Sequence, residues 1–333
     1  LFRSGAEMID MEFVQFHPTG MVWPPGVKGI LVTEAVRGEG GRLTNNKGER
    51  FMERYDPKRM ELSTRDQVAR AIYTEVKEGR GSEHGGVYLS VTHLDGESVK
   101  KKLPSMYHQF KDLADVDITK APMEVGPTTH YMMGGLRVDP DTGETTLPGL
   151  YAAGEVAGGM HGGNRLGGNS LSDLLVFGKL AGEAAAKKVK GMGKNAGPDP
   201  AQIEAGINEM LAPMQRTEGP SPYEIHDELQ DVMQNLVGIM RIEGDLKLAL
   251  EKLAVLKEKQ KKVRVTGGRI YNPGWHLAYD LGNLINTSIA IATAALAREE
   301  SRGAHTRLDH PKTSPEWEKI THVIQKEIGR AHV

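Results

Sequence analysis

Cysteine is absent from this 333-residue sequence. A disulfide framework, a thiolate metal site and a cysteine-ligated iron–sulfur cluster are therefore excluded on this chain. A strong charge of either sign is also missing, because 42 Lys and Arg stand against 44 Asp and Glu, for a net charge of −2. This balance favours neither nucleic acid nor an anionic membrane surface as a partner.

Long apolar runs are missing as well. The closest is "INTSIAIATAALA" (285–297), which is shorter than the roughly 20 residues of a membrane span, so no span is expected. The sequence starts at Leu1 inside an alternating segment, and we expect an N-terminal part to be missing. The final segment "EIGRAHV" (327–333) matches the translation of a common sequencing-library adapter, so we treat it as an artefact.

Hydrophobic periodicity predicts a mixed chain. Short strands and turns are expected over residues 6–50, with "GILVTEAV" (29–36) as one strand. A helix capped by Ser63 and ended by Gly79 is expected next, followed by a strand at 85–94. Helices follow at 95–120, 170–189 and through 202–300, and then an irregular charged tail at 301–326. The fold class is therefore α/β plus α.

Glycine is abundant, at 40 residues, and much of it lies between Gly126 and Gly182. This cluster is more typical of a site than of a linker.

Four short stretches carry residues suited to binding anions. They are "HPTG" (17–20), "VTEAVRGEGG" (32–41), "THYMMGG" (129–135) and "NRLGGNSL" (164–171), together with Arg65. Arg165 can hold a carboxylate with a planar two-pronged fork, and His17, His130 and Thr33 can donate further hydrogen bonds. The loop around Arg165 lacks the spacing of either common phosphate-binding fingerprint.

Each stretch also has an ordinary interpretation when taken alone. "HPTG" fits a simple turn, Arg65 a surface ion pair, His130 a core histidine and "RGEGG" a solvated loop. No set of His, Asp and Glu has zinc-ligand spacing, and no nucleophile motif is present, so no metal is expected.

Taken together and in this order, the motifs resemble the flavoprotein subunit of succinate dehydrogenase and fumarate reductase. The matching segments are "MEFVQFHPTG", "LVTEAVRGEGG", "ERFMERY", "STRDQVARAI", "THYMMGG", "PGLYAAGEV", "HGGNRLGGNSL" and "ESRGAHTR". The resemblance implies the end of a first FAD-domain segment at 1–11, a capping domain at 12–128 and a returning segment of a Rossmann-like FAD-binding domain at 129–195. A helical domain at 200–305 and a tail at 306–326 follow.

The resemblance also assigns roles to individual residues. His17, Thr33, His130 and Arg165 fall where the dicarboxylate is bound. Arg65 matches the proton-transfer arginine, and Glu34 with Arg37 matches the proton route to it. Three further positions fall where FAD is contacted: Glu155, Ser170 and Leu171.

The implied reaction is the oxidation of succinate to fumarate, or the reverse. A hydride passes between a substrate carbon and the flavin N5, and an arginine transfers the proton. The FAD is expected to be attached covalently through a histidine in the missing N-terminal part, without which the fragment alone is expected to be inactive.

The resemblance implies partners as well. An iron–sulfur subunit is expected to receive the electrons and pass them to a quinone, and separate subunits are expected to anchor the complex. The chain would then lie peripherally at the cytoplasmic face of a bacterial inner membrane.

Three alternatives stay open at this point. L-aspartate oxidase shares the scaffold, but has Ala in place of Gly20, "HYTCGG" in place of "HYMMGG" and "RMASNS" in place of "RLGGNS". Adenylylsulfate reductase is a more distant possibility. A fragment that binds no FAD and serves only as a binding module is a third.

Overall fold

The computed structural model describes residues 5–193 and 197–325. The adapter-like segment 327–333 and the first four residues of the predicted 1–11 segment lie outside this range. The chain forms two compact units: Val14–Tyr131, here called the inserted unit, and Leu1–Phe13 with Met132–Val333, here called the split unit. The inserted unit nearly coincides with residues 12–128, the range expected to form a capping domain. That this unit acts as a cap stays a prediction.

A four-stranded sheet in the order β2-β5-β4-β3 organises the described residues of the inserted unit. Its strands are β2 (Val14–Met21), β3 (Arg42–Thr44), β4 (Val87–Ser90) and β5 (Met123–Met132). Because β2 lies at the edge, Pro18 interrupts no central ladder. The helices are α1 (Ala35–Gly38), α2 (Met52–Tyr55), α3 (Arg65–Glu75), α4 (Gly96–Lys102) and α5 (Pro104–Ala114).

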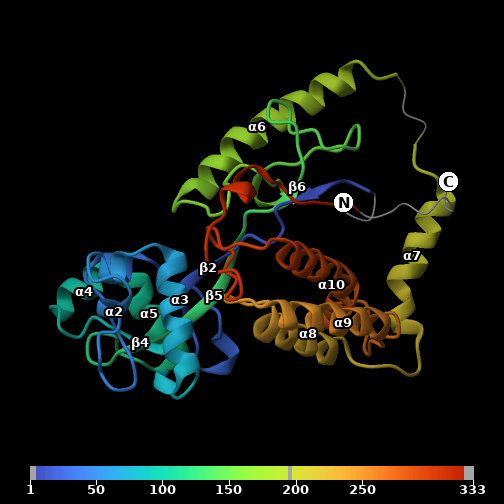
Figure 1. The fold of residues 1–333 in the computed structure, drawn as a ribbon. Helices are drawn as coiled ribbons and strands as arrows, with labels where there is room; N and C mark the ends of the chain where they lie inside the picture. The colour runs from blue at the N-terminus through green and yellow to red at the C-terminus, as the bar shows by residue number, and fades with distance from the viewer. Residues whose placement is uncertain (1–4, 194–196, 326–333) are drawn as a thin grey trace. The chain divides into compact units, whose positions relative to one another are not determined.

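The core of the inserted unit lies between this sheet and its helices, with α3 packed on β2 (Figure 1). Val68 and Ile72 of α3 are fully buried, as their spacing predicts, together with Leu43, Leu89 and Phe110 from other elements.

Two local predictions in this unit are wrong. Residues 29–36 do not form a strand: Leu31 makes only an isolated bridge with Gly20, and α1 begins at Ala35. The buried Val32 and Val36 are four residues apart, a spacing that places two side chains on one face of a strand or of a helix alike, so it could not exclude the helix that forms. Ser63 does not cap α3, because Thr64 occupies the N-cap position and the Ser63 hydroxyl bonds instead to Gln67.

The described residues of the split unit combine a small antiparallel sheet with long helices. The sheet has the order β6-β1-β7 and consists of β1 (Met8–Ile9), β6 (Gly135–Leu136) and β7 (Val323–Ile324). The helices are α6 (Asn169–Lys190), α7 (Pro200–Gln215), α8 (Pro222–Leu236), α9 (Glu243–Gln260) and α10 (Pro273–Ala297).

Helices α8, α9 and α10 pack side by side around an apolar core (Figure 1). A capping box of Ser221 and Glu224 starts α8. The helix ends at Leu236, so Met240 does not continue its buried face as the periodicity suggests. Buried apolar positions recur at helical spacing: Ile225, Leu229, Val232, Leu246, Leu253, Leu256, Leu281 and Ile285.

Helix α6 differs from this bundle because most of its apolar side chains are exposed. Leu171, Leu174, Leu175 and Val176 all lie at the surface, while Asp173 and Ala181 are buried. No helix within the described ranges combines the length and apolarity that a membrane span needs.

Candidate active site and flavin-binding residues

His17 and His130 lie on neighbouring strands of the inserted unit, β2 and β5. Their rings are in edge-to-face contact, with the centroids 5.5 Å apart. His17 is buried, and its Nδ1 lies 3.0 Å from the carbonyl oxygen of Thr19 and 3.3 Å from the Thr19 amide nitrogen. Thr19 therefore supports either neutral tautomer of His17.

The surroundings of His17 keep its imidazole neutral. Burial lowers the pKa of His17 to about 4, and the positive charges of Arg65 and Arg37 add to this effect. A histidine whose pKa is lowered by folding binds its proton more readily in the unfolded chain, so stability falls as the pH drops from 6.5 toward 4.

We predict that this loss disappears when His17 is replaced. Between pH 7.5 and pH 4.5 the wild type should lose about 2 kcal/mol more unfolding free energy than His17→Gln, because only the wild type carries the buried imidazole. Denaturant unfolding at both pH values measures the difference. Parallel stability curves for the two proteins would contradict a buried neutral His17.

Arg65 and Glu34 form a charged pair beside these histidines. Arg65 is the first residue of α3, and Glu34 precedes α1. The Arg65 Nε and Nη2 lie 2.8 and 2.7 Å from Glu34 Oε2. Burial raises the pKa of Glu34, but the hydrogen bond and charge of Arg65 outweigh it and keep the carboxylate pKa below its ordinary value.

Arg37 extends this pair inward from Glu34. Its Nη2 lies 3.9 Å from Glu34 Oε2, which is an ion pair rather than a hydrogen bond. Its Nη1 donates to the carbonyl oxygen of Glu61 at 2.6 Å, and burial lowers the pKa of the guanidinium. The structure thus brings together the three residues assigned to proton transfer.

Three buried nitrogens of this cluster have no hydrogen bond among the described residues: Arg37 Nε, Arg37 Nη2 and Arg65 Nη1. A buried donor of a charged group without a partner is costly, which makes such an atom a candidate for contact with a bound anion.

Thr33 lies immediately before Glu34. Its Oγ1 accepts the Ala35 amide hydrogen at 3.4 Å, which leaves the hydroxyl hydrogen to serve as a donor.

Arg165 belongs to the split unit and lies on the loop that precedes α6. Its side chain is only 5% exposed, whereas the neighbouring Leu166 is 74% exposed. The loop therefore buries the Arg165 side chain, although the sequence of the loop is too rich in glycine and polar residues to predict that burial.

The residues assigned to FAD also lie on the split unit. Glu155 is exposed, its Oε1 accepts the Met132 amide hydrogen at 2.8 Å, and it lines a cavity of about 420 Å³. Gly168 occupies the N-cap position before α6 with a φ of +85°, and no side-chain hydrogen bond caps this end within the described structure. Ser170 and Leu171 follow in the first turn.

This set fits a flavin nucleotide. A carboxylate suits its hydroxyl groups, and an uncapped helix N-terminus suits its polar, electron-rich edge.

Sequence reasoning missed two contacts of the split unit. It gave no structural role to His161 or to the "ESRGAHTR" segment (300–307). The structure pairs His161 Nε2 with Asp173 Oδ2 at 3.5 Å, and places Glu300 and His305 fully inside the unit. The His161–Asp173 pair could have been predicted, because these two residues flank the glycine-rich loop in the sequence.

Comparisons with known proteins identify the family of the chain. A model of the FAD binding domain matches residues 1–171, and a model of the fumarate reductase flavoprotein C-terminus matches residues 226–332. A fumarate reductase (CoM/CoB) chain from Methanothermobacter marburgensis is 50% identical over 323 residues, which are 96% of this chain and 57% of the relative. The succinate dehydrogenase flavoprotein subunit of Coxiella burnetii is 40% identical over 339 residues, covering 96% and 56%.

A solved structure gives the same result. The Mycobacterium smegmatis Sdh1 complex with UQ1 aligns with a TM-score of 0.85 at 54% identity, over 97% of this chain and 54% of that one. The chain spans about half the length of the curated relatives it matches. By these matches, the chain belongs to the flavoprotein family of succinate dehydrogenase and fumarate reductase.

Proposed function

We propose that the protein containing this chain interconverts succinate and fumarate with FAD as its redox cofactor. The observation that carries the proposal is the Arg65–Glu34–Arg37 cluster beside a neutral His17, with the buried Nη1 of Arg65 lacking a hydrogen-bond partner. A substrate with two carboxylates needs several donors, and a proton-transfer step needs a group linked to solvent.

The binding roles follow from the donors. Arg165 and His130 hold one carboxylate, and His17 and Thr33 hold the other. A carboxylate at Nε2 of His17 selects the tautomer with its proton on that nitrogen, while Thr19 N–H donates to Nδ1. Because this imidazole is neutral in the free protein, the arginines supply the positive charge.

Arg65 transfers the proton. In the direction of fumarate reduction its guanidinium, the charged form that arginine carries at neutral pH, donates a proton to the substrate carbon. The reverse direction needs the neutral guanidine as the base, a form that arginine rarely takes. Glu34 is half exposed, so it can take a proton from water and pass it to Arg65. The hydrogen bond and charge of Arg65, with a smaller contribution from the charge of Arg37, keep Glu34 ionised, and Arg37 needs only a small shift from 3.9 Å to join the route.

FAD, when bound, supplies hydride exchange with the substrate carbon. Glu155, Ser170 and Leu171 are the residues of this chain that hold it, and covalent attachment through a histidine outside this chain belongs to the same proposal. If the flavin lies at the N-terminus of α6, the positive end of that helix would favour the electron-rich reduced form.

The remaining proposals concern the assembly. The chain has no cysteine to ligate an iron–sulfur cluster, so we infer that a separate iron–sulfur subunit accepts the electrons and passes them to a quinone. Anchor subunits would hold the complex at the cytoplasmic face of a bacterial inner membrane. One structural neighbour is a quinol–fumarate reductase with menaquinol molecules, at a TM-score of 0.85 and 34% identity.

The decisive experiment compares two activities of the complete polypeptide that carries this chain. We expect succinate-dependent reduction of an artificial electron acceptor and no aspartate-dependent formation of hydrogen peroxide. The opposite pattern would identify an L-aspartate oxidase and overturn the proposal. A preparation with no FAD bound serves as the blank.

A further inference from the structure

A close backbone contact fixes the loop that carries Arg165. The carbonyl oxygen of Gly163 accepts the Ala304 amide hydrogen at 2.9 Å. A Cβ atom at Gly303 would lie 2.3 Å from that same oxygen, so only glycine fits there. Gly163 is two residues before Arg165, so this contact sets where the arginine leaves the backbone.

The partner of Gly163 is a tight hairpin, Arg302–His305. Arg302 and His305 exchange two backbone hydrogen bonds of 2.9 Å, and Gly303 turns the chain with a φ of +55°. A rigid two-residue turn of this kind presents Ala304 N–H in a single direction.

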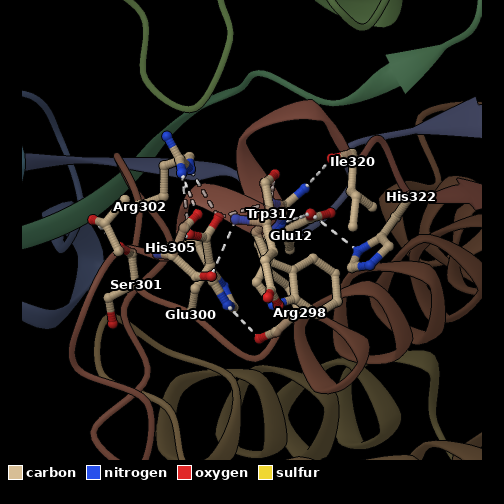
Figure 2. A network of polar contacts seen from close by, with 12 residues as sticks. Glu12, Arg298, Glu300, Ser301, Arg302, His305, Trp317, Ile320 and His322 are labelled. Atoms are coloured by element: carbon tan, nitrogen blue, oxygen red, sulfur yellow. Dashed lines mark hydrogen bonds and ion pairs between the residues drawn. The ribbon is translucent and has the colours of Figure 1, made fainter.

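A buried charged network holds the hairpin in place (Figure 2). Glu300 is fully buried and accepts hydrogen bonds from Arg298 Nη1 at 2.9 Å, from Arg302 Nε at 2.8 Å and from Ser314 N at 2.9 Å. His305 is fully buried and lies 2.7 Å from the Nη1 of Arg241. The network therefore fixes both ends of the hairpin.

Two arginines of the network also connect it to Glu12, which lies 286 residues before Arg298. Arg298 pairs with the Glu12 carboxylate, and Arg241 Nη1 donates to the Glu12 carbonyl oxygen at 2.7 Å. Such a connected set of buried charges has one low-energy arrangement, because a displaced member leaves another unpaired.

The same loop is held a second time, through His161. The His161 and Asp173 side chains form a largely buried pair, and Asp173 belongs to α6. The backbone before Arg165 is thus attached both to α6 and to the hairpin.

We infer that the hairpin Arg302–His305 and its charged network position Arg165 for carboxylate binding, with Gly303 and Gly163 as the positioning residues. The inference rests on the proposed function of Arg165. The end of a helical bundle does not need a buried charged network for its stability. Through the contact with Gly163, this network restrains a glycine-rich loop that could otherwise adopt many conformations, and so fixes the position of Arg165.

The test measures malonate binding by calorimetry on the complete, FAD-loaded polypeptide. Gly303→Ala should raise the malonate Kd by about tenfold or more, and raise KM for succinate more than it lowers kcat, because the loop is pushed away while the other residues stay. The FAD content and absorption spectrum should match the wild type. Gly48→Ala is the matched control: Gly48 also has a positive φ, +76°, but no atom lies within 4 Å of the added Cβ.

A milder variant keeps the test decisive if Gly303→Ala does not fold. Gly163→Ala would place its Cβ 3.3 Å from the Phe13 ring and 3.5 Å from Arg302 Cγ, so a Kd several-fold higher is expected. An unchanged Kd in the folded variant, with Arg165→Ala still losing malonate, would overturn the positioning role alone. An unchanged Kd in Arg165→Ala would overturn the carboxylate site and the positioning role with it.

Discussion

Replacing Arg165 with alanine is expected to weaken malonate binding to the complete polypeptide by about a hundredfold or more. A charge-assisted, two-pronged contact with a carboxylate is lost, and such contacts at buried positions contribute about 2–5 kcal/mol. Arg165 is buried on its loop, so solvent does not weaken the contact. Malonate titration followed by calorimetry measures the effect.

Arg137→Ala is the matched control for this variant. Arg137 lies on the same unit, but its side chain is 57% exposed and pairs with Glu7 at 3.1 Å, so its removal should leave malonate binding unchanged. Full malonate affinity in Arg165→Ala would exclude Arg165 from the carboxylate site.

The second large effect is expected from Arg65→Gln. Turnover should fall by a factor of roughly 10²–10⁴, the usual contribution of a positioned acid or base. Malonate binding should weaken by a smaller factor, because Arg65 is only one of several donors proposed to contact the anion. Glutamine can still donate a hydrogen bond to Glu34, but it carries no positive charge and has no proton to transfer at neutral pH. Steady-state rates with succinate and with fumarate, beside the malonate Kd, separate the two quantities.

Arg70→Gln provides the comparison on the same helix. Arg70 lies five residues further along α3 and pairs with Asp66 at 2.9 Å, so it reports any general effect of losing an α3 arginine. Normal turnover in Arg65→Gln would exclude Arg65 from proton transfer. An equal loss of turnover in Arg70→Gln would point to damage to α3 instead.

Much of the helical architecture could be predicted from spacing alone. Ile225, Leu229 and Val232 recur along α8 at intervals of three and four residues and are buried as expected. The segment 29–36 shows where this reasoning fails, because a short apolar run fits a strand, a turn or a helix equally well. Only its surroundings decided the outcome: Val32 N donates to Thr19 O, and α1 then begins at Ala35.

In the candidate site, too, the sequence predicted the residues but not their geometry. Motif order identified Arg65, Glu34 and Arg37, but no pattern in the sequence places the Arg65 guanidinium on Glu34, 31 residues away. The lowered pKa of His17 likewise depends on burial and on charges brought in by other elements. Such quantities are properties of the folded unit.

The sequence by itself determined the helix periodicity, the absence of cysteine ligands and the glycine-rich loop around Arg165. Tertiary structure alone decided which charged residues near the start of the irregular tail are buried. Arg298 and Glu300, just before the tail, and Arg307 within it are buried, because each finds partners that neutralise it. One such partner, Glu12, lies almost the whole described chain away from Arg298, and a charge can be buried only where folding brings an opposite charge to it.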